Sequence, residues 1–175
     1  MLHKAAYVAQ DDLSRKHTFE FCGSCVGASG GYTQREGMTR RLHEFTVRTP
    51  ERECLVEVTP RVAQAVRSSG VRSGVALLYV PHTTCGLVIQ ENADPGVGHD
   101  ILLLLRRIAP RGDPAYRHVE ENTPAHLQSS LTGHATFVFV QDGELVLGRW
   151  QAIFLAEFDG PRTRTVLVKV LPDPP

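Results

Sequence analysis

Four strand-like segments follow one another in the last quarter of the chain, and this run is the strongest constraint on its fold. Each is an apolar or alternating stretch of strand length, and polar turns separate them. The segments are residues 135–140, 144–147, 150–158 and 165–171. The Asp142-Gly143 pair between the first two is the strongest signal for a tight hairpin. The run therefore predicts an antiparallel meander.

Earlier segments add further strands. Residues 42–47 and 54–58 alternate apolar and polar side chains around a turn at 49–52, so we predict that they form a hairpin. Residues 75–80 are continuously apolar, which predicts a central strand covered on both faces. Residues 86–90 are predicted to be the continuation or the neighbour of that strand.

Three helices are predicted where a proline follows a capping residue. The pairs are Thr59-Pro60, Asp94-Pro95 and Thr123-Pro124, and the helices are expected to end near Gly70, Pro110 and Gly133. Strands and helices then follow the order ββαββααββββ, which lacks the strict alternation of a doubly wound parallel sheet. We therefore predict an α+β fold, in which antiparallel sheets form a sandwich or half-barrel with two to three helices packed on one side.

The residues before Met38 differ from the rest of the chain. Residues 1–37 are rich in glycine and serine and show no sustained strand or helix period, which predicts a flexible leader or a mis-called start. Residues 38–175 are predicted to form a single domain. Cys22 and Cys25 have C-x-x-C spacing, but no second pair follows, so coincidence is favoured over a redox or zinc site.

Composition limits the class of function. Apolar residues make up 42% of the chain and charged residues 22%, with a formal net charge of zero, so no overall attraction to nucleic acid or to anionic membranes is expected. The longest strongly apolar run, residues 101–105, is far too short to cross a bilayer, and the first residues lack the pattern of a signal peptide. We therefore predict a cytoplasmic protein without a nucleic-acid or membrane partner.

The segment after residue 80 offers groups that could bind an anion. His82, Thr83 and Thr84 stand at the predicted strand end, where hydroxyls and backbone N–H groups can together satisfy phosphate oxygens. Ser130, on the third predicted helix, could add a donor, although helical serines usually face solvent or bond to their own backbone. No Walker lysine or G-x-G-x-x-G motif accompanies these residues, so the phosphate prediction depends on their local chemistry.

Glu91, Asn92 and Asp94 precede the second predicted helix. Together with the histidines considered next, they are the other half of the candidate site. Asp94 is expected to cap that helix, since its carboxylate can accept the first free N–H groups. Glu91 is the freer carboxylate and could be a general base, a metal ligand or a partner that orients a histidine. The alternative for Glu91 is a solvated loop carboxylate. Asn92 lies between the two.

Three histidines lie in polar segments that follow predicted elements: His82 at a strand end, His118 in a loop and His126 on a short helix. Neutral imidazole is the commonest transition-metal ligand, and three protein ligands with one open position are typical of catalytic zinc. Neither H-x-x-x-H nor H-E-x-x-H occurs, so their spacing permits a shared metal without requiring one. The alternative is three ordinary, partly exposed histidines that cap or bridge loops.

Three motifs, in order and in approximate spacing, resemble the bacterial and archaeal YjbQ family, also called UPF0047 and labelled secondary thiamine-phosphate synthases. They are HTTCGLVIQENADP, YRHVEENTPAHLQSSLTG and LGRWQAIFLAEFDGPRTRTVLVKVL, and the resemblance covers about residues 40–172. It implies a compact α+β domain that assembles as a homotrimer. It also implies a polar site that contains His82, His118 and His126 together with Glu91, Asn92 and Asp94.

The resemblance further implies an activity, the joining of hydroxymethylpyrimidine diphosphate to thiazole phosphate with release of diphosphate. Under this interpretation His82, His118 and His126 hold a divalent metal, with zinc or another transition metal suspected and magnesium possible with the substrate. Catalysis is then assigned to Glu91, His82 and Asp94, and substrate binding to Thr83, Thr84, Asn92 and Ser130. The alternatives are a metal-dependent hydrolase of a small phosphorylated metabolite and a non-catalytic trimer that binds a ligand.

Overall fold

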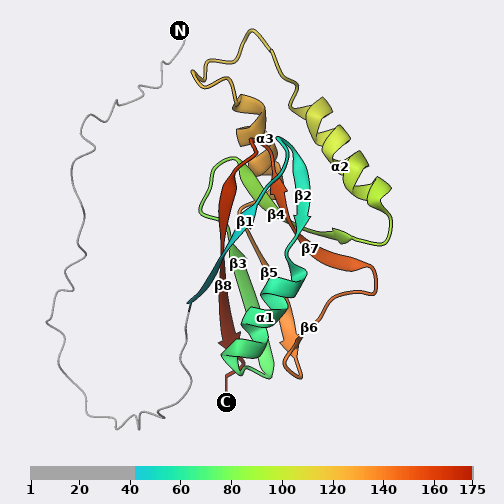
Figure 1. Ribbon diagram of the computed structural model, residues 1–175, viewed down its shortest axis with the longest axis vertical. Helices are drawn as coiled ribbons and strands as arrows, with labels where there is room; N and C mark the ends of the chain where they lie inside the picture. Colours follow the sequence, from blue (N-terminus) through green and yellow to red (C-terminus); the bar gives the residue numbers. More distant parts are fainter. Residues whose placement is uncertain (1–41, 175) are drawn as a thin grey trace, which may run out of the picture. The chain divides into compact units, whose positions relative to one another are not determined.

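The structure, a computed structural model, describes residues 42–174 (Figure 1). Its elements are β1 (Leu42–Arg48), β2 (Cys54–Glu57), α1 (Thr59–Ser69), β3 (Ser73–Tyr79), β4 (Cys85–Glu91), α2 (Pro95–Ile108), α3 (Thr123–Thr132), β5 (Ala135–Gln141), β6 (Glu144–Leu145), β7 (Gln151–Glu157) and β8 (Thr163–Pro172). This is the predicted order of strands and helices. The predicted leader, with Cys22 and Cys25, lies outside the described residues.

The strands form two antiparallel sheets. The larger has the order β1-β8-β3-β5-β6 and the smaller has the order β2-β7-β4. Buried apolar residues from both sheets meet between them, among them Leu78, Ile153, Leu155 and Val166. Helix α1 joins this core through Val62 and Val66, which are fully buried. The predicted α+β half-barrel with helices is therefore confirmed.

The predicted hairpin between residues 42–47 and 54–58 is wrong. Strand β1 pairs with β8, whereas β2 pairs with β7 in the other sheet. The connection between β1 and β2 is bound to the connection between β7 and β8. The Thr49 N–H donates to the Arg162 carbonyl at 2.8 Å, and the Arg162 N–H donates to the Thr49 hydroxyl at 2.8 Å. These contacts direct the two strands into different sheets.

The predicted meander is confirmed only for its first turn. Strands β5 and β6 form a hairpin, and Asp142 and Gly143 have the positive φ angles of 55° and 83° that such a two-residue turn requires. Strand β7 then crosses to the smaller sheet, and β8 returns to lie between β1 and β3. Strand β4 is also in the smaller sheet, beside β7, so the prediction that it continues or neighbours β3 is wrong. Local sequence patterns do not reveal these long-range partners.

Strand β3 is central, as predicted, but residues 42–174 cover only one of its faces. Ala76 and Leu78 are buried, whereas Leu77 and Tyr79 are exposed. In the strand register Leu77 is opposite Phe137 and Lys169, and further apolar residues share this side of the sheet. We call the exposed side the outer face, and its large exposed apolar residues are Leu42, Leu77, Tyr79, Phe137, Phe139 and Leu171.

The helix starts differ in how they are capped. Asp94 caps α2 as predicted, because its Oδ1 accepts the Gly96 N–H at 2.7 Å. Thr59 does not cap α1: it is the first helical residue, and its hydroxyl accepts the Ile153 N–H at 2.8 Å, so it ties α1 to β7. None of the helices within residues 42–174 is both long and apolar enough to span a membrane.

Candidate functional site

The two halves of the predicted site lie at opposite ends of β4. Glu91 is the last residue of this strand and is followed by Asn92 and Asp94, whereas His82 and the two threonines precede its first residue. A strand of seven residues is roughly 20 Å long. Within one copy of the chain, the acidic residues are therefore separated from His82, and each end must be considered by itself.

His82 is held by the backbone of β8. Its Nε2 accepts the Thr165 N–H at 2.8 Å, so the neutral ring carries its proton on Nδ1. Burial lowers the pKa of His82, the Arg164 guanidinium lowers it further, and Glu157 opposes these effects only in part. The neutral form is therefore favoured, and Nε2 has no lone pair left for a metal while this hydrogen bond persists.

A buried ion pair lies beside His82. Glu157 is fully buried, and its two oxygens accept Nε and Nη2 of Arg164 at 2.7 and 2.6 Å. The same carboxylate accepts the Thr49 hydroxyl at 3.0 Å and two backbone N–H groups. Burial by itself would raise the pKa of Glu157, but these hydrogen bonds and the guanidinium charge hold it below its ordinary value. The pair is thus fully ionised and satisfied.

Thr84 belongs to this network. Its hydroxyl accepts Nη2 of Arg164 at 2.8 Å and is buried, while Thr83 beside it is exposed. Sequence analysis missed Glu157 and Arg164, although a signal was present. A carboxylate stands at the end of an otherwise apolar predicted strand, and two arginines follow it within seven residues. A charge placed among buried strand residues usually requires a buried partner.

The other two predicted metal ligands do meet. The rings of His118 and His126 are in edge contact with centroids 5.0 Å apart, and Nε2 of His118 is 3.9 Å from a carboxylate oxygen of Glu120. Ser130 is one turn further along α3, but its hydroxyl donates to the His126 carbonyl at 2.8 Å. Across residues 42–174, no three His, Cys, Asp or Glu side chains are arranged to hold a metal ion. The three-histidine metal site stays a prediction.

Asn122 lies at the start of α3 in the same region. Its amide nitrogen donates to Asp159 at 3.2 Å and to Glu120 at 3.3 Å. The side chain is buried, and its Oδ1 has no partner within the part of the chain that the structure describes. Burial raises the pKa of Asp159, but Arg162 and Asn122 more than offset this and hold it below its usual value. The α3 start is therefore a second polar centre that the sequence patterns did not indicate.

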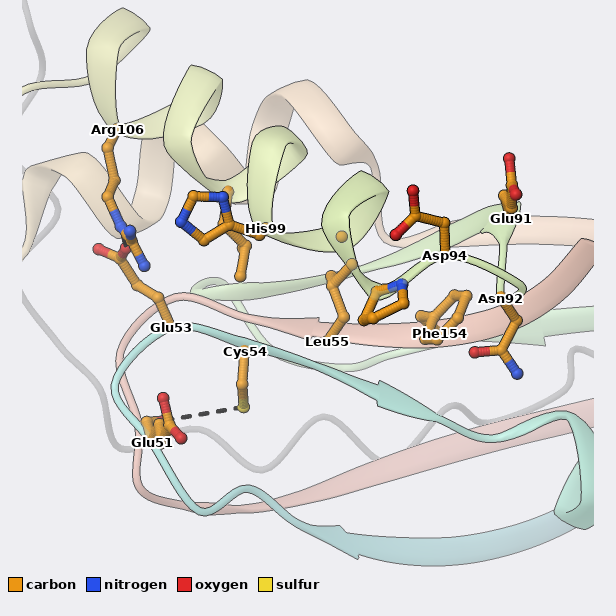
Figure 2. Close-up of a pocket in the computed structure, with 13 residues that line it drawn as sticks. Glu51, Glu53, Cys54, Leu55, Glu91, Asn92, Asp94, His99, Arg106 and Phe154 are labelled. Carbon is orange, nitrogen blue, oxygen red and sulfur yellow. Dashed lines mark hydrogen bonds and ion pairs between the residues drawn. The ribbon is translucent and has the colours of Figure 1, made fainter.

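The acidic end of β4 opens into a pocket. It has a volume of about 410 Å³ and lies between α2 and the β2-β7-β4 sheet (Figure 2). We call it the α2 groove. Its lining residues include Glu91, Asn92 and Asp94 from the predicted site. An apolar wall is provided by Leu55 of β2, Leu102 of α2 and Phe154 of β7.

The acidic end of the α2 groove contains carboxylates with free capacity. The Glu91 side chain makes no hydrogen bond within residues 42–174, and only one oxygen of Asp94 is used by the helix cap. Asn92 is more constrained, since its amide donates to Glu57 at 2.9 Å and its N–H donates to the Trp150 carbonyl at 2.8 Å. This end can accept hydrogen bonds and positive charge.

The opposite end of the α2 groove is lined by Arg106, and Arg111 lies beside it on the same carboxylate. Glu53 is almost buried and accepts Nε of Arg106 and Nη2 of Arg111, the latter at 2.6 Å. Burial would raise the pKa of Glu53, but the two guanidinium groups keep it below its ordinary value. A second cavity of about 300 Å³ opens here and is lined by Glu51, Arg52 and the same three residues. The sequence patterns did not indicate this arginine cluster.

Comparison with known proteins identifies relatives over most of the chain. The family model described as "UPF0047 protein YjbQ-like" matches residues 43–173. The UPF0047 protein of Methanocaldococcus jannaschii is 45% identical over 134 residues, covering 77% of this chain and 96% of the relative. The UPF0047 protein YugU of Bacillus subtilis is 42% identical over 130 residues, covering 74% and 98%.

Solved structures show the same fold. An uncharacterised YjbQ/UPF0047 protein of Clostridium acetobutylicum superposes with a TM-score of 0.71 at 44% identity, covering 74% of this chain and 99% of that one. A protein of Sulfolobus solfataricus, described as YbjQ-like and of unknown function, gives a TM-score of 0.72 at 33% identity, covering 76% and 97%.

These relatives overturn the predicted activity. The curated relatives are named only as UPF0047 proteins, and the similar structures are described as uncharacterised or of unknown function. None of these descriptions includes thiamine-phosphate synthesis, so the assignment of that reaction to this chain is wrong. What the resemblance does establish is descent and fold: the chain belongs to the YjbQ-like UPF0047 family.

Proposed function

We propose that this protein binds small amine-bearing molecules in the α2 groove. The observation that carries the proposal is the combination, in one 410 Å³ groove, of an apolar wall with the available carboxylates of Glu91 and Asp94. An ammonium group would lie against these carboxylates, and the apolar part of the ligand would pack on Leu55 and Phe154. The groove is within the usual volume range of small-molecule sites.

Charge favours an amine over a phosphate at this site. Four carboxylates and one guanidinium line the α2 groove, so a phosphate at its acidic end would meet charges of its own sign. An ammonium group there would be attracted by both carboxylates. It could donate to the two oxygens of Glu91 and to the free oxygen of Asp94. Because the site is open to water, each ion pair contributes at most about 1 kcal/mol, and apolar contact must supply the rest of the affinity.

Calorimetric titration with hexylamine tests this proposal. We expect hexylamine to bind at the acidic end of the groove, and we expect hexanoate, which carries the opposite charge, to gain nothing from Glu91 and Asp94. The variant Glu91→Gln should lower the affinity for hexylamine about fivefold, which corresponds to about 1 kcal/mol. Glu120→Gln is the matched control, because Glu120 is an exposed carboxylate outside the groove, and it should bind like the unaltered protein. A hexylamine affinity that is the same in Glu91→Gln and in the unaltered protein would refute the assignment.

A separate proposal concerns the His118–His126 pair, which we infer to bind a transition metal. The contact between two imidazoles with Glu120 beside them supports a nitrogen-rich site. His82 does not fit the same metal within one copy, because its Nε2 accepts the Thr165 N–H. A metal held here would supply Lewis-acid chemistry. Any further ligands must come from water, substrate or another copy.

Cobalt absorption tests the metal proposal without any assay of activity. The protein, stripped with chelator and titrated with Co²⁺, should show the visible spectrum of a bound ion with one equivalent per chain. His126→Ala should abolish this spectrum, whereas His99→Ala, which alters an exposed histidine on α2, should retain it. A spectrum that survives His126→Ala would place the metal elsewhere.

We also propose that the outer face joins copies of this chain. Its six large apolar residues are 36–59% exposed, and a contiguous apolar patch of this kind marks an interaction surface. The occupant we infer is a second copy, because so large an apolar area is typical of permanent self-association. A homotrimer stays a prediction.

A further inference from the structure

The α2 groove, taken with the second cavity that opens at its far end, carries opposite charges at its two ends. Figure 2 shows Arg106 and Glu53 at one end, and Glu91 and Asp94 at the other. Helix α2 runs between them, from its cap at Asp94 to Arg106 in its last turn. Twelve residues of α-helix rise roughly 18 Å, so the two charged ends are separated by about this distance. The groove is therefore both bipolar and elongated.

The arginine end has donors left over. Each guanidinium carries five N–H donors, and Glu53 uses one from Arg106 and one from Arg111. Arg52 adds a third guanidinium to the second cavity, whose lining has only the carboxylates Glu51 and Glu53 to balance it. The local charge is thus positive, and a carboxylate placed here could be bound by paired N–H donors.

We propose that the α2 groove binds a short linear peptide by both of its free termini. The N-terminal ammonium would lie against Glu91 and Asp94, and the C-terminal carboxylate against the arginine end. An extended chain spans about 3.3–3.6 Å per residue, so five or six residues bridge roughly 18 Å, whereas a single amino acid reaches only one end. The proposal rests on the proposed amine site for its N-terminal half.

The wall of the groove suits such a ligand. In an extended peptide successive side chains point to opposite sides, so every second side chain would face the protein. Leu55, Leu102 and Phe154 present apolar surface between the charged ends. We therefore expect the groove to prefer peptides with apolar side chains at alternate positions. The side chains at the other positions should have little effect on affinity.

Four versions of one hexapeptide, with alternating leucine and serine, test the proposal by calorimetry. The versions have both ends free, the N-terminus acetylated, the C-terminus amidated, or both ends blocked. Each single block should lower affinity about three- to fivefold, and the double block about tenfold or more. If amidation has no effect while acetylation weakens binding, the peptide proposal fails and the amine site stands. If acetylation has no effect, both fail.

Protein variants locate the carboxylate end. Arg52→Gln should remove most of the difference between the free and amidated C-termini and leave the effect of acetylation unchanged. Arg72→Gln is the matched control, because Arg72 is an exposed arginine paired with Asp142 away from the groove, and it should retain both effects. A tripeptide is too short to reach both ends of the groove. Its affinity should therefore change when one of its termini is blocked but not when the other is blocked. Full sensitivity of the tripeptide to both blocks would contradict binding across the length of α2.

Discussion

Arg164→Met will lower the free energy of unfolding by about 3–5 kcal/mol, which is the usual cost of breaking a buried ion pair on one side only. The arginine side chain is 7% exposed and its partner Glu157 is 0% exposed. Removing the guanidinium leaves the carboxylate buried with only Thr49 and two backbone N–H groups as donors. Thr84 also loses the donor that fixes its hydroxyl.

Urea denaturation followed by circular dichroism, at one fixed protein concentration, measures this loss. The control is Arg72→Met, which breaks the exposed pair with Asp142 and should cost less than about 1 kcal/mol. A double variant, Glu157→Leu with Arg164→Met, should recover part of the stability because it leaves no unpaired buried charge. A loss below 1 kcal/mol in the single variant would show that the ion pair is dispensable.

The stability difference should also depend on pH. In the unaltered protein the pKa of Glu157 is lowered, so its ionised form stabilises the fold above the ordinary value of 4.5, and this contribution is lost as the pH falls through the folded-state pKa. In the variant, burial without the guanidinium raises the pKa instead, so protonation at acid pH relieves the buried charge. The gap between the two proteins should therefore be largest near pH 7 and should narrow as the pH falls, first through the raised pKa of the variant and then through the lowered pKa of the unaltered protein.

Phe139→Lys will convert the proposed assembly to single chains. Phe139 is 59% exposed on β5, at one side of the outer face, and is opposite Val75 of β3. An ammonium group there would be buried without a partner at an interface between copies, and one such desolvated charge outweighs a modest apolar interface. Light scattering after gel filtration should give a multiple of 19.3 kDa for the unaltered protein and 19.3 kDa for the variant.

The control for this experiment is Leu131→Lys. Leu131 is also 59% exposed, but it lies on α3 and not on the outer face. This variant should keep the mass of the unaltered protein, and circular dichroism should show that both variants are folded. An unaltered protein that elutes as a single chain, or a Phe139→Lys protein that keeps its assembly, would contradict association through the outer face.

The elements of this fold are predictable because each carries its own local signal. The Asp142-Gly143 turn and the prolines that follow Asp94 and Thr123 act through backbone geometry within a few residues. Strand partners depend instead on contacts such as that between Thr49 and Arg162, which are 113 residues apart. The hairpin prediction assumed that strands adjacent in the sequence pair with each other. Strands β1 and β2 are adjacent in the sequence but lie in different sheets.

The candidate site was only partly predictable for a similar reason. Residue type selected Glu91 and Asp94, which line the α2 groove, and His118 and His126, whose rings are in contact, but it could not show that β4 separates the acidic residues from His82. It also could not show that Glu53, just after the predicted turn at 49–52, binds Arg106 in the last turn of α2 and Arg111 beyond that helix. The residue types predict which chemical groups are present. Which of these groups lie close together depends on how strands that are distant in the sequence pair.

Helix α2 has a mechanical consequence for the α2 groove. No residue of the helix is fully buried, and its polar attachments are at its ends, the cap at Asp94 and the clamp on Glu53. Lifting this helix uncovers Leu102 and Leu105 but leaves the core between the two sheets closed, so it requires less free energy than unfolding of the sheets. One wall of the groove can therefore yield to admit a bulky occupant, and an occupant that contacts both walls would slow the amide exchange of that helix.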